Sequence, residues 1–244
     1  MTSSPPLQSR CTYDVYEKGY RTSLKRTYDN NNRTLQKYLL PSTFRDHYNT
    51  RGLFEGSLIQ WCAQFGDASK IMLDIGAHTG TYGLTLAHKF KRVVCFEPQK
   101  ATFYALCGSI ALSGPLMIQQ VETYRVGLGS SEQVGEQTLY IPSVDGGGSS
   151  VINSSGALGA EKIEIRTLDS FNFGDQVGFI KMDIEGNELN CLRGAVDTIR
   201  QSHPRILFEA NSAAELAPVA TFLTEQLNYK VTPISGYSNM YLAE

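Results

Sequence analysis

A short apolar run that ends beside an acidic residue and leads at once into closely spaced glycines is the most constraining feature of this 244-residue chain. Residues 71–75 read Ile-Met-Leu-Asp-Ile, and residues 76–80 continue as Gly-Ala-His-Thr-Gly. An almost uninterrupted apolar run predicts a strand buried on both faces, as in a parallel sheet. Small residues after such a strand let the backbone approach a ligand at the start of the next helix. The feature therefore predicts an α/β domain with a ligand site at the carboxyl end of this strand.

Further apolar runs alternate with helical patterns along the rest of the chain. Residues 93–97, 177–184 and 205–209 read as buried strands, and the segments that follow them carry apolar side chains at helical spacing. This alternation predicts a mostly parallel sheet with helices on both faces. In the last helical pattern, up to residue 227, we expect Pro218 to lie in the first turn.

Three regions depart from this alternation. Residues 121–170 hold strand-like pieces around a glycine-rich loop, and residues 229–243 predict a closing antiparallel hairpin around Gly236. The polar residues before 54 show no sustained period, so we expect a mobile start followed by short helices that cap the core. The expected organisation is an N-terminal extension over 1–53, partly irregular and helical, and one catalytic domain over 54–244.

Composition limits the class of protein. A net charge of −2 gives no broad basic face for nucleic acid, and no run approaches the roughly 18 apolar residues of a membrane span. The five cysteines are odd in number and form no Cys-x-x-Cys pair, which argues against a disulfide framework or a zinc site. The Ser/Pro-rich start lacks the apolar core of a signal peptide, so the cytoplasm is the expected location. The oligomeric state does not follow from the sequence.

An acidic residue at the end of the next strand narrows the choice of ligand. Glu97 follows the glycine turn by about twenty residues, where a carboxylate can accept two hydrogen bonds from ribose hydroxyls. This role is common to NAD and S-adenosylmethionine proteins. NAD-binding turns favour Gly-x-Gly-x-x-Gly, whereas this turn has Gly76, Gly80 and Gly83. An NAD-dependent oxidoreductase of Rossmann type and a non-catalytic adenosine-binding module stay open as alternatives.

Several motifs together resemble those of the FkbM family of methyltransferases, and the turn after Asp74 resembles the class I methyltransferase signature Asp-x-Gly-x-x-x-Gly. His78 stands where members of the family usually have Asn. The motifs read Asp-Ile-Gly-Ala-His-Thr-Gly-Thr-Tyr at 74–82, Phe-Glu-Pro at 96–98, Gly-Leu-Gly at 127–129, Gly-Gly-Ser-Ser at 147–150, Thr-Leu-Asp at 167–169, Lys-Met-Asp-Ile-Glu-Gly-Asn-Glu at 181–188 and Arg-Gly-Ala at 193–195.

This resemblance covers about residues 54–211. It implies a class I, Rossmann-like fold with a seven-stranded sheet, S-adenosyl-L-methionine as cofactor, and O-methylation of a sugar, a glycan or another small hydroxylated acceptor. A carboxylate suits the cationic methionine end of that cofactor. The implied cofactor-binding residues are Asp74, Gly76, Ala77, His78, Thr79, Gly80, Glu97 and Gly127.

The candidate catalytic residues lie at the ends of two later strands. Strand alternation places Lys181, Asp183 and Glu185 on one side of their strand, and charges in a buried strand are tolerated only when paired or facing a wet cleft. Glu209 ends the following strand and is expected to approach the same cleft. An alcohol becomes a good nucleophile when a base accepts its proton, so Asp183 is the first candidate base and Glu209 the alternative.

Two further roles are open for these charged residues. An ion pair from Lys181 to one of the acids is the structural alternative to a catalytic role. The three acids together can also hold a divalent metal ion such as Mg²⁺, which is possible but not expected.

Overall fold

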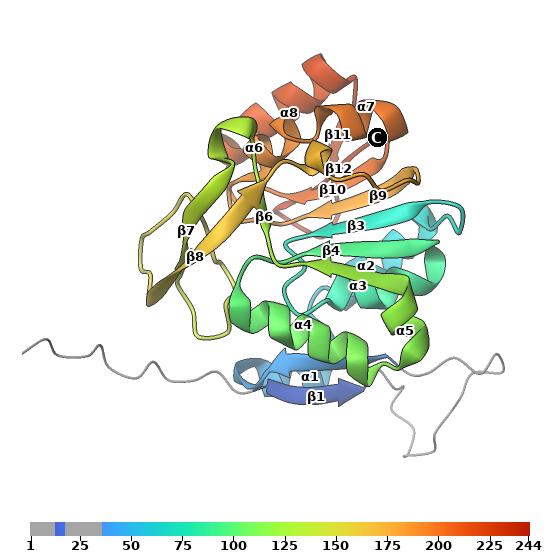
Figure 1. The fold of residues 1–244 in the computed structure, drawn as a ribbon, viewed down its shortest axis with the longest axis vertical. Coiled ribbons are helices and arrows are strands. Elements are labelled where there is room, and N and C mark those ends of the chain that lie inside the picture. The colour runs from blue at the N-terminus through green and yellow to red at the C-terminus, as the bar shows by residue number, and fades with distance from the viewer. Residues whose placement is uncertain (1–12, 18–35) are drawn as a thin grey trace, which may run out of the picture.

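A seven-stranded, mostly parallel sheet forms the centre of the computed structural model, which describes residues 13–17 and 36–244 (Figure 1). The strand order is β11-β12-β10-β9-β3-β4-β5, and β12 runs antiparallel to both of its neighbours. This confirms the expected sheet and the closing C-terminal hairpin. The strands are β3 (Ile71–Ile75), β4 (Arg92–Phe96), β5 (Val121–Tyr124), β9 (Val177–Met182), β10 (Arg205–Glu209), β11 (Val231–Pro233) and β12 (Met240–Ala243).

Helices cover both faces of this sheet because its central strands are apolar on both sides. In β3, Met72 belongs to one apolar core, while Leu73 and its alternate neighbours belong to the other. The first core packs against α2 (Gly56–Cys62), α3 (Thr81–Leu86) and α4 (Lys100–Leu112), and α5 (Pro115–Gln120) follows α4. The second packs against α6 (Glu188–Arg193), α7 (Val196–Ser202) and α8 (Ala213–Leu227). No described helix combines the length and apolar character needed to cross a membrane.

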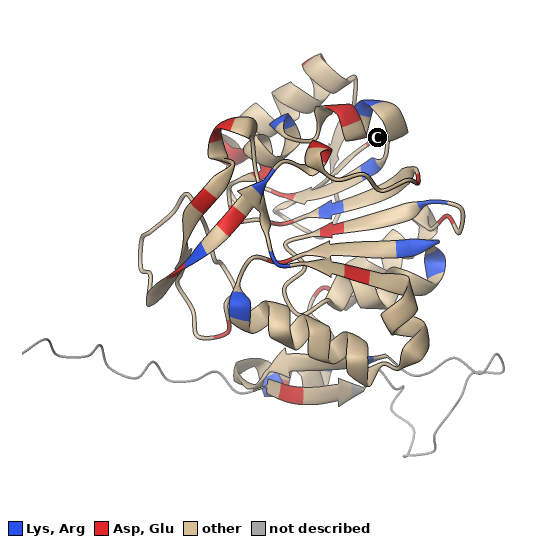
Figure 2. Ribbon diagram, in the orientation of Figure 1, with Lys and Arg blue, Asp and Glu red and all other residues tan. Residues whose placement is uncertain are grey.

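A small second sheet stands beside the main one (Figure 1). Its strands are β6 (Gly127–Leu128), β7 (Gly135–Ile141) and β8 (Gly159–Arg166), in the order β6-β8-β7. Alternate residues of β8 point inward, so that Ile163 and Ile165 pack on Leu139, while charged residues between them face outward. Figure 2 shows this alternation as acidic and basic bands on β7 and β8.

The N-terminal segment forms a strand pair as well as the expected short helix. β1 (Tyr13–Glu17) pairs antiparallel with β2 (Lys37–Pro41), and α1 (Arg45–Arg51) follows. The strands do not show in the sequence because β2 is held by tertiary contacts. The backbone N–H of Leu39 donates a 2.8 Å hydrogen bond to Ser109 Oγ of α4, and that of Lys37 donates one of 2.8 Å to Ser113 Oγ at the C-terminal cap of α4. Residues 1–12, where a mobile start is expected, lie outside the described residues.

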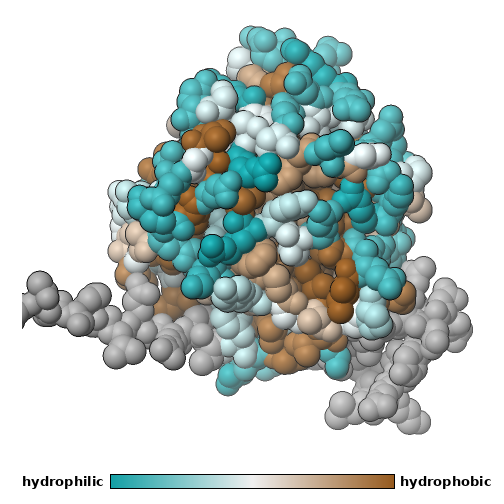
Figure 3. All heavy atoms as spheres, in the orientation of Figure 1, coloured by the Kyte–Doolittle hydropathy of each residue, from teal (hydrophilic) through white to brown (hydrophobic). Residues whose placement is uncertain are grey.

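Helix α4 lies between the main sheet and the N-terminal strand pair. Beyond Lys100 it carries no charged residue, which Figure 2 shows plainly, and both of its long sides are covered. A helix covered on two sides loses the polar stripe typical of a surface helix. Figure 3 shows apolar atoms at the surface on the lower half of this face, where α4 and α5 lie and where Leu112, Leu116 and Ile118 are exposed.

Short 3-10 helices complete the chain. They are η1 (Ser42–Phe44), η2 (Ala63–Phe65), η3 (Ala87–Lys89), η4 (Ser131–Gln133) and η5 (Leu168–Ser170).

Candidate active site

A pocket of about 380 Å³ opens at the carboxyl ends of β3, β4, β9 and β10, within the size range of small-molecule sites. Parallel strands place their carboxyl ends at one edge of the sheet, and the loops after them form the walls. Of the residues singled out from the sequence, those that line this pocket are Gly76, Ala77, His78, Thr79, Glu97, Lys181, Asp183, Glu185 and Glu209. Asp74, Gly80 and Gly127 lie outside the lining.

The turn after β3 is built around two residues with left-handed backbone conformation. Gly76 has φ +72°, and a Cβ atom there would lie 1.8 Å from the carbonyl oxygen of Asp183, so only glycine fits. His78 has φ +50°, a conformation in which Asn and His are enriched among residues other than glycine. A histidine is therefore tolerated at this position. The hydroxyl of Thr79 is buried at the pocket wall and has no hydrogen-bond partner among the described residues.

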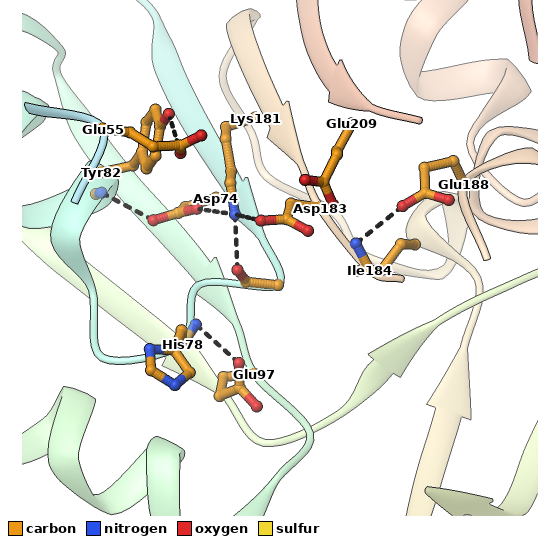
Figure 4. Close-up of polar contacts among 12 residues, drawn as sticks. Glu55, Asp74, His78, Tyr82, Glu97, Lys181, Asp183, Ile184, Glu188 and Glu209 are labelled. Carbon is orange, nitrogen blue, oxygen red and sulfur yellow. Dashed lines mark hydrogen bonds and ion pairs between the residues drawn. The ribbon is translucent and has the colours of Figure 1, made fainter. Parts of the chain in front are cut away.

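Glu97 anchors this turn to the next strand. Its Oε2 accepts a 2.8 Å hydrogen bond from the backbone N–H of His78, which Figure 4 shows, and its Oε1 accepts bonds of 2.9 Å from Gln99 N and Thr102 Oγ1. Burial raises the pKa of Glu97. A carboxylate offers about four acceptor positions, so these three contacts leave room for one further donor rather than two.

Lys181 and Asp74 form the polar centre beneath the pocket. The two residues are paired in register on β9 and β3. The Lys181 ammonium donates a 2.8 Å hydrogen bond to Gly76 O and lies 3.9 Å from Asp74 Oδ1 and 3.5 Å from Asp183 Oδ2 (Figure 4). Burial disfavours the charged amine, but the carboxylates of Asp183 and Asp74 outweigh it and raise the pKa of Lys181. Asp74 is fully buried, and its Oδ2 accepts a hydrogen bond from Gly83 N at the start of α3. Asp74 therefore supports the turn from below.

Three carboxylates gather where β9 and β10 end. Asp183, Glu185 and Glu209 each offer an oxygen within 4.8 Å of the others, an arrangement that can take a divalent cation. Glu185 lies beyond the end of β9. Its own backbone is left-handed, with φ +55°, and its side chain still joins the group. Two amide groups hold Glu209: Asn239 Nδ2 donates to Oε1 at 2.6 Å and Asn211 Nδ2 to Oε2 at 3.1 Å. Burial, followed by the charges of Asp183 and Glu185, raises the pKa of Glu209 to about 8.

A fourth carboxylate, Glu188, lies behind this group and outside the pocket lining. It is buried at the start of α6, where its Oε1 accepts a 2.9 Å hydrogen bond from Ile184 N (Figure 4). Burial raises the pKa of Glu188 to about 7. Its observed role is to hold the backbone between β9 and α6.

The glycine-rich loop closes one side of the pocket and is tied to the turn after β3. Residues 146–149 line the pocket, and the His78 ring bonds to Asp145 O through Nε2 at 3.0 Å. The Asp145 carboxylate holds the loop by accepting hydrogen bonds from Ser143 Oγ and Gly147 N. Gly127 packs below Ile165 of β8, and its neighbour Leu128 is the residue that reaches the pocket.

Sequence reasoning missed two parts of the pocket wall. Tyr82 of α3 donates a 2.7 Å hydrogen bond to Glu55 Oε2, and both side chains line the pocket beside Lys181 (Figure 4). Phe44 and Phe54 meet edge-on, with ring centroids 4.9 Å apart, and both line the pocket. Glu55 carries no sequence signal because its position depends on a left-handed turn before α2.

The sheet order, with the antiparallel β12, is that of the class I, Rossmann-like methyltransferase fold. A family model for the methyltransferase FkbM domain matches residues 74–231. The chain belongs to this family.

Two proteins show how far the similarity extends. Hexuronic acid methyltransferase AglP from Haloferax volcanii is 22% identical over 182 residues, which cover 74% of this chain and 73% of AglP. The crystal structure of methyltransferase FkbM from Methylobacillus flagellatus KT shares the fold with a TM-score of 0.51 at 22% identity. The match covers 72% of this chain and 44% of that protein, so the chain spans less than half of its length.

Proposed function

We propose that this protein is an S-adenosylmethionine-dependent O-methyltransferase that methylates a hydroxyl of a sugar or glycan, with a carboxylate as general base. The observation that carries the proposal is the grouping of Asp183, Glu185 and Glu209 at strand ends that also border the turn after β3. The turn receives the cofactor and the carboxylates receive the hydroxyl. Both halves of the reaction therefore meet in one pocket.

The residues of the turn fit an adenosine cofactor. The absence of a side chain at Gly76 leaves backbone open to close approach, and the unpartnered Thr79 hydroxyl offers a donor and acceptor at the pocket wall. Glu97 keeps capacity for one ribose hydroxyl. When bound, S-adenosylmethionine supplies an electrophilic methyl group. Ala77, His78 and Gly80 shape the turn that holds the cofactor, while Asp74 and Gly127 act from behind the pocket.

The carboxylates supply the proton chemistry that an alcohol needs. Asp183 lies 3.5 Å from the Lys181 ammonium, and this ion pair fixes its orientation. Asp183 would accept the hydroxyl proton as the carbon–oxygen bond forms and the methyl–sulfur bond breaks, with S-adenosylhomocysteine as the leaving group. With its pKa of about 8, Glu209 keeps its proton at neutral pH and orients Asp183 or a second substrate hydroxyl. Above that pH it becomes the alternative base.

The aromatic part of the pocket wall suits a sugar. Phe44, Tyr48 and Phe54 present aromatic surface, while acidic side chains that also line the pocket accept hydrogen bonds from hydroxyls. The similarity to AglP, a methyltransferase named for a hexuronic acid, supports an acceptor from the class of sugars. Since the aromatic side chains come mainly from residues 36–54, we propose that the N-terminal extension forms the acceptor wall of the domain that begins near residue 54.

A screen of sugar acceptors tests this function directly. The protein is incubated with S-adenosylmethionine and a panel of glycosides, and products are examined for S-adenosylhomocysteine and for a mass gain of one methylene group. We expect both products to appear together with at least one sugar. Binding of NAD(H) without binding of S-adenosylmethionine in a calorimetric titration would contradict the proposal.

A further inference from the structure

We infer that the acceptor is a neutral hydroxylated sugar and that the pocket discriminates against the corresponding uronic acid; this rests on the proposed function. The inference starts from the charges around the pocket. Among the described residues, five acidic side chains line it, and one lysine does so. The acidic residues are Glu55, Glu97, Asp183, Glu185 and Glu209, and the lysine is Lys181.

The lysine is committed to the protein's own groups. The ammonium of Lys181 donates a 2.8 Å hydrogen bond to Gly76 O and forms ion pairs with Asp183 Oδ2 at 3.5 Å and with Asp74 Oδ1 at 3.9 Å. Its side chain is only 5% exposed. Turning it toward a ligand would leave Asp74 buried without its counter-ion, so Lys181 serves the protein's own carboxylates.

The reacting end of the pocket already groups three acidic side chains, and with its pKa of about 8 Glu209 keeps its proton there rather than add a further negative charge. Figure 4 shows Asp183 and Glu209 close together near the ammonium of Lys181, and His78 with Glu97 set apart from them. Burial, followed by the charges of the neighbouring carboxylates, raises the pKa of Glu209 and of Glu185. A uronate would add another carboxylate to this group, whereas the hydroxymethyl group of a neutral hexose donates a hydrogen bond to it. The same acids that activate a hydroxyl therefore select against an anionic sugar.

The inferred preference for a neutral sugar differs from the acceptor in the name of AglP, which is a hexuronic acid. AglP is 22% identical to this chain. Two proteins with this level of identity can share a fold and still bind different acceptors, because the residues of the pocket determine the acceptor.

Matched pairs of acceptors test the inference. Glucosides, galactosides and mannosides are each compared with the uronide that differs only in carrying a carboxylate in place of the hydroxymethyl group. Formation of S-adenosylhomocysteine gives kcat/KM for each member, with EDTA and again with added Mg²⁺. For a pair that is methylated, we expect kcat/KM of the neutral member to exceed that of the uronide by about tenfold or more, because juxtaposed like charges weaken binding strongly. We also expect the ratio to shrink at high salt.

A charge-removing variant links the preference to the pocket. Glu185→Gln should lower the ratio between the neutral and acidic members, while Glu136→Gln, an exposed charge on β7, should leave it unchanged. Equal or better turnover of the uronide, with or without Mg²⁺, would overturn the inference and leave the methyltransferase intact. If no pair yields S-adenosylhomocysteine, the proposed function itself fails, and the inference fails with it.

Discussion

The ammonium of Lys181 lies 3.9 Å from Asp74 Oδ1, a fully buried oxygen that has no hydrogen-bond partner among the described residues. The ion pair is therefore the main compensation for placing this oxygen away from water. It joins the ends of β3 and β9 below the glycine turn. The stability of the turn should depend on it.

Replacing the lysine should destabilise the protein strongly. Lys181→Met leaves the Asp74 carboxylate buried without its counter-ion, and breaking a buried pair in this way costs about 3–5 kcal/mol. Asp74→Asn combined with Lys181→Met should recover part of this loss, because no net charge then stays buried. Chemical denaturation of the two variants measures the difference. A single variant as stable as the wild type, or a double variant no more stable than the single one, would contradict this account of the pair.

The glycine turn provides a second prediction. Gly76→Ala places a Cβ atom against the carbonyl of Asp183 and forces alanine to a positive φ. We therefore expect the free energy of unfolding to fall by at least about 2 kcal/mol. Gly56→Ala is the matched control, because a Cβ there meets nothing within 4 Å and alanine favours a helix. Thermal unfolding should show a lower midpoint for the first variant and an equal or higher one for the control. Similar midpoints would refute the strain at Gly76.

The pKa of Glu188 predicts a pH-dependent stability difference. Burial raises this pKa from 4.5 to about 7, so the folded protein binds more protons than the unfolded chain between these two values. The free energy of unfolding that Glu188 contributes therefore falls as pH rises through this window and stays constant above it. Glu188→Gln keeps an acceptor for Ile184 N but does not titrate. Denaturation across pH should show the wild type losing stability relative to this variant between about pH 4.5 and 7; parallel profiles would contradict the assignment.

Glu97 should control the affinity for the cofactor. Three donors now point at the Glu97 carboxylate, and Glu97→Gln replaces it with an amide that has only one acceptor oxygen. The substitution therefore disturbs the turn and weakens the acceptor for a ribose hydroxyl. We expect the Kd for S-adenosylmethionine to rise about tenfold or more, as for the loss of a hydrogen bond to a charged group. Calorimetry measures it, with Glu136→Gln as the control. An unchanged Kd would exclude Glu97 from the cofactor site.

Local patterns were enough to predict β3, β4, β9, β10 and the C-terminal hairpin, whereas the seven-stranded sheet was implied by the family resemblance and β5 had no local signal of its own. The apolar run of β3, the turn that follows it and the acid after β4 are contiguous, so periodicity and spacing reveal them. The sequence does not reveal that Asp74 is a partner of Lys181. The register of β3 against β9 depends on a connection of about a hundred residues, which local patterns do not describe.

Strand alternation was a weaker guide beyond the strand itself. β9 ends at Met182, so the period of two does not extend to Glu185; that residue joins Asp183 through its left-handed backbone instead. The expectation for Pro218 was wrong. Ser212 accepts a hydrogen bond from Glu215 N and starts α8 early, which places Pro218 inside the helix rather than in its first turn.

The most direct test of the central claim compares turnover and cofactor affinity in Asp183→Asn. Asparagine preserves the size of the side chain and an acceptor for Lys181, but it cannot act as the base. We expect the rate of S-adenosylhomocysteine formation with a methylated sugar to fall by about 10²–10⁴-fold, while the Kd for S-adenosylmethionine changes little. A variant that turns over at the wild-type rate, or that loses cofactor affinity in proportion to turnover, would contradict the role of Asp183 as the base.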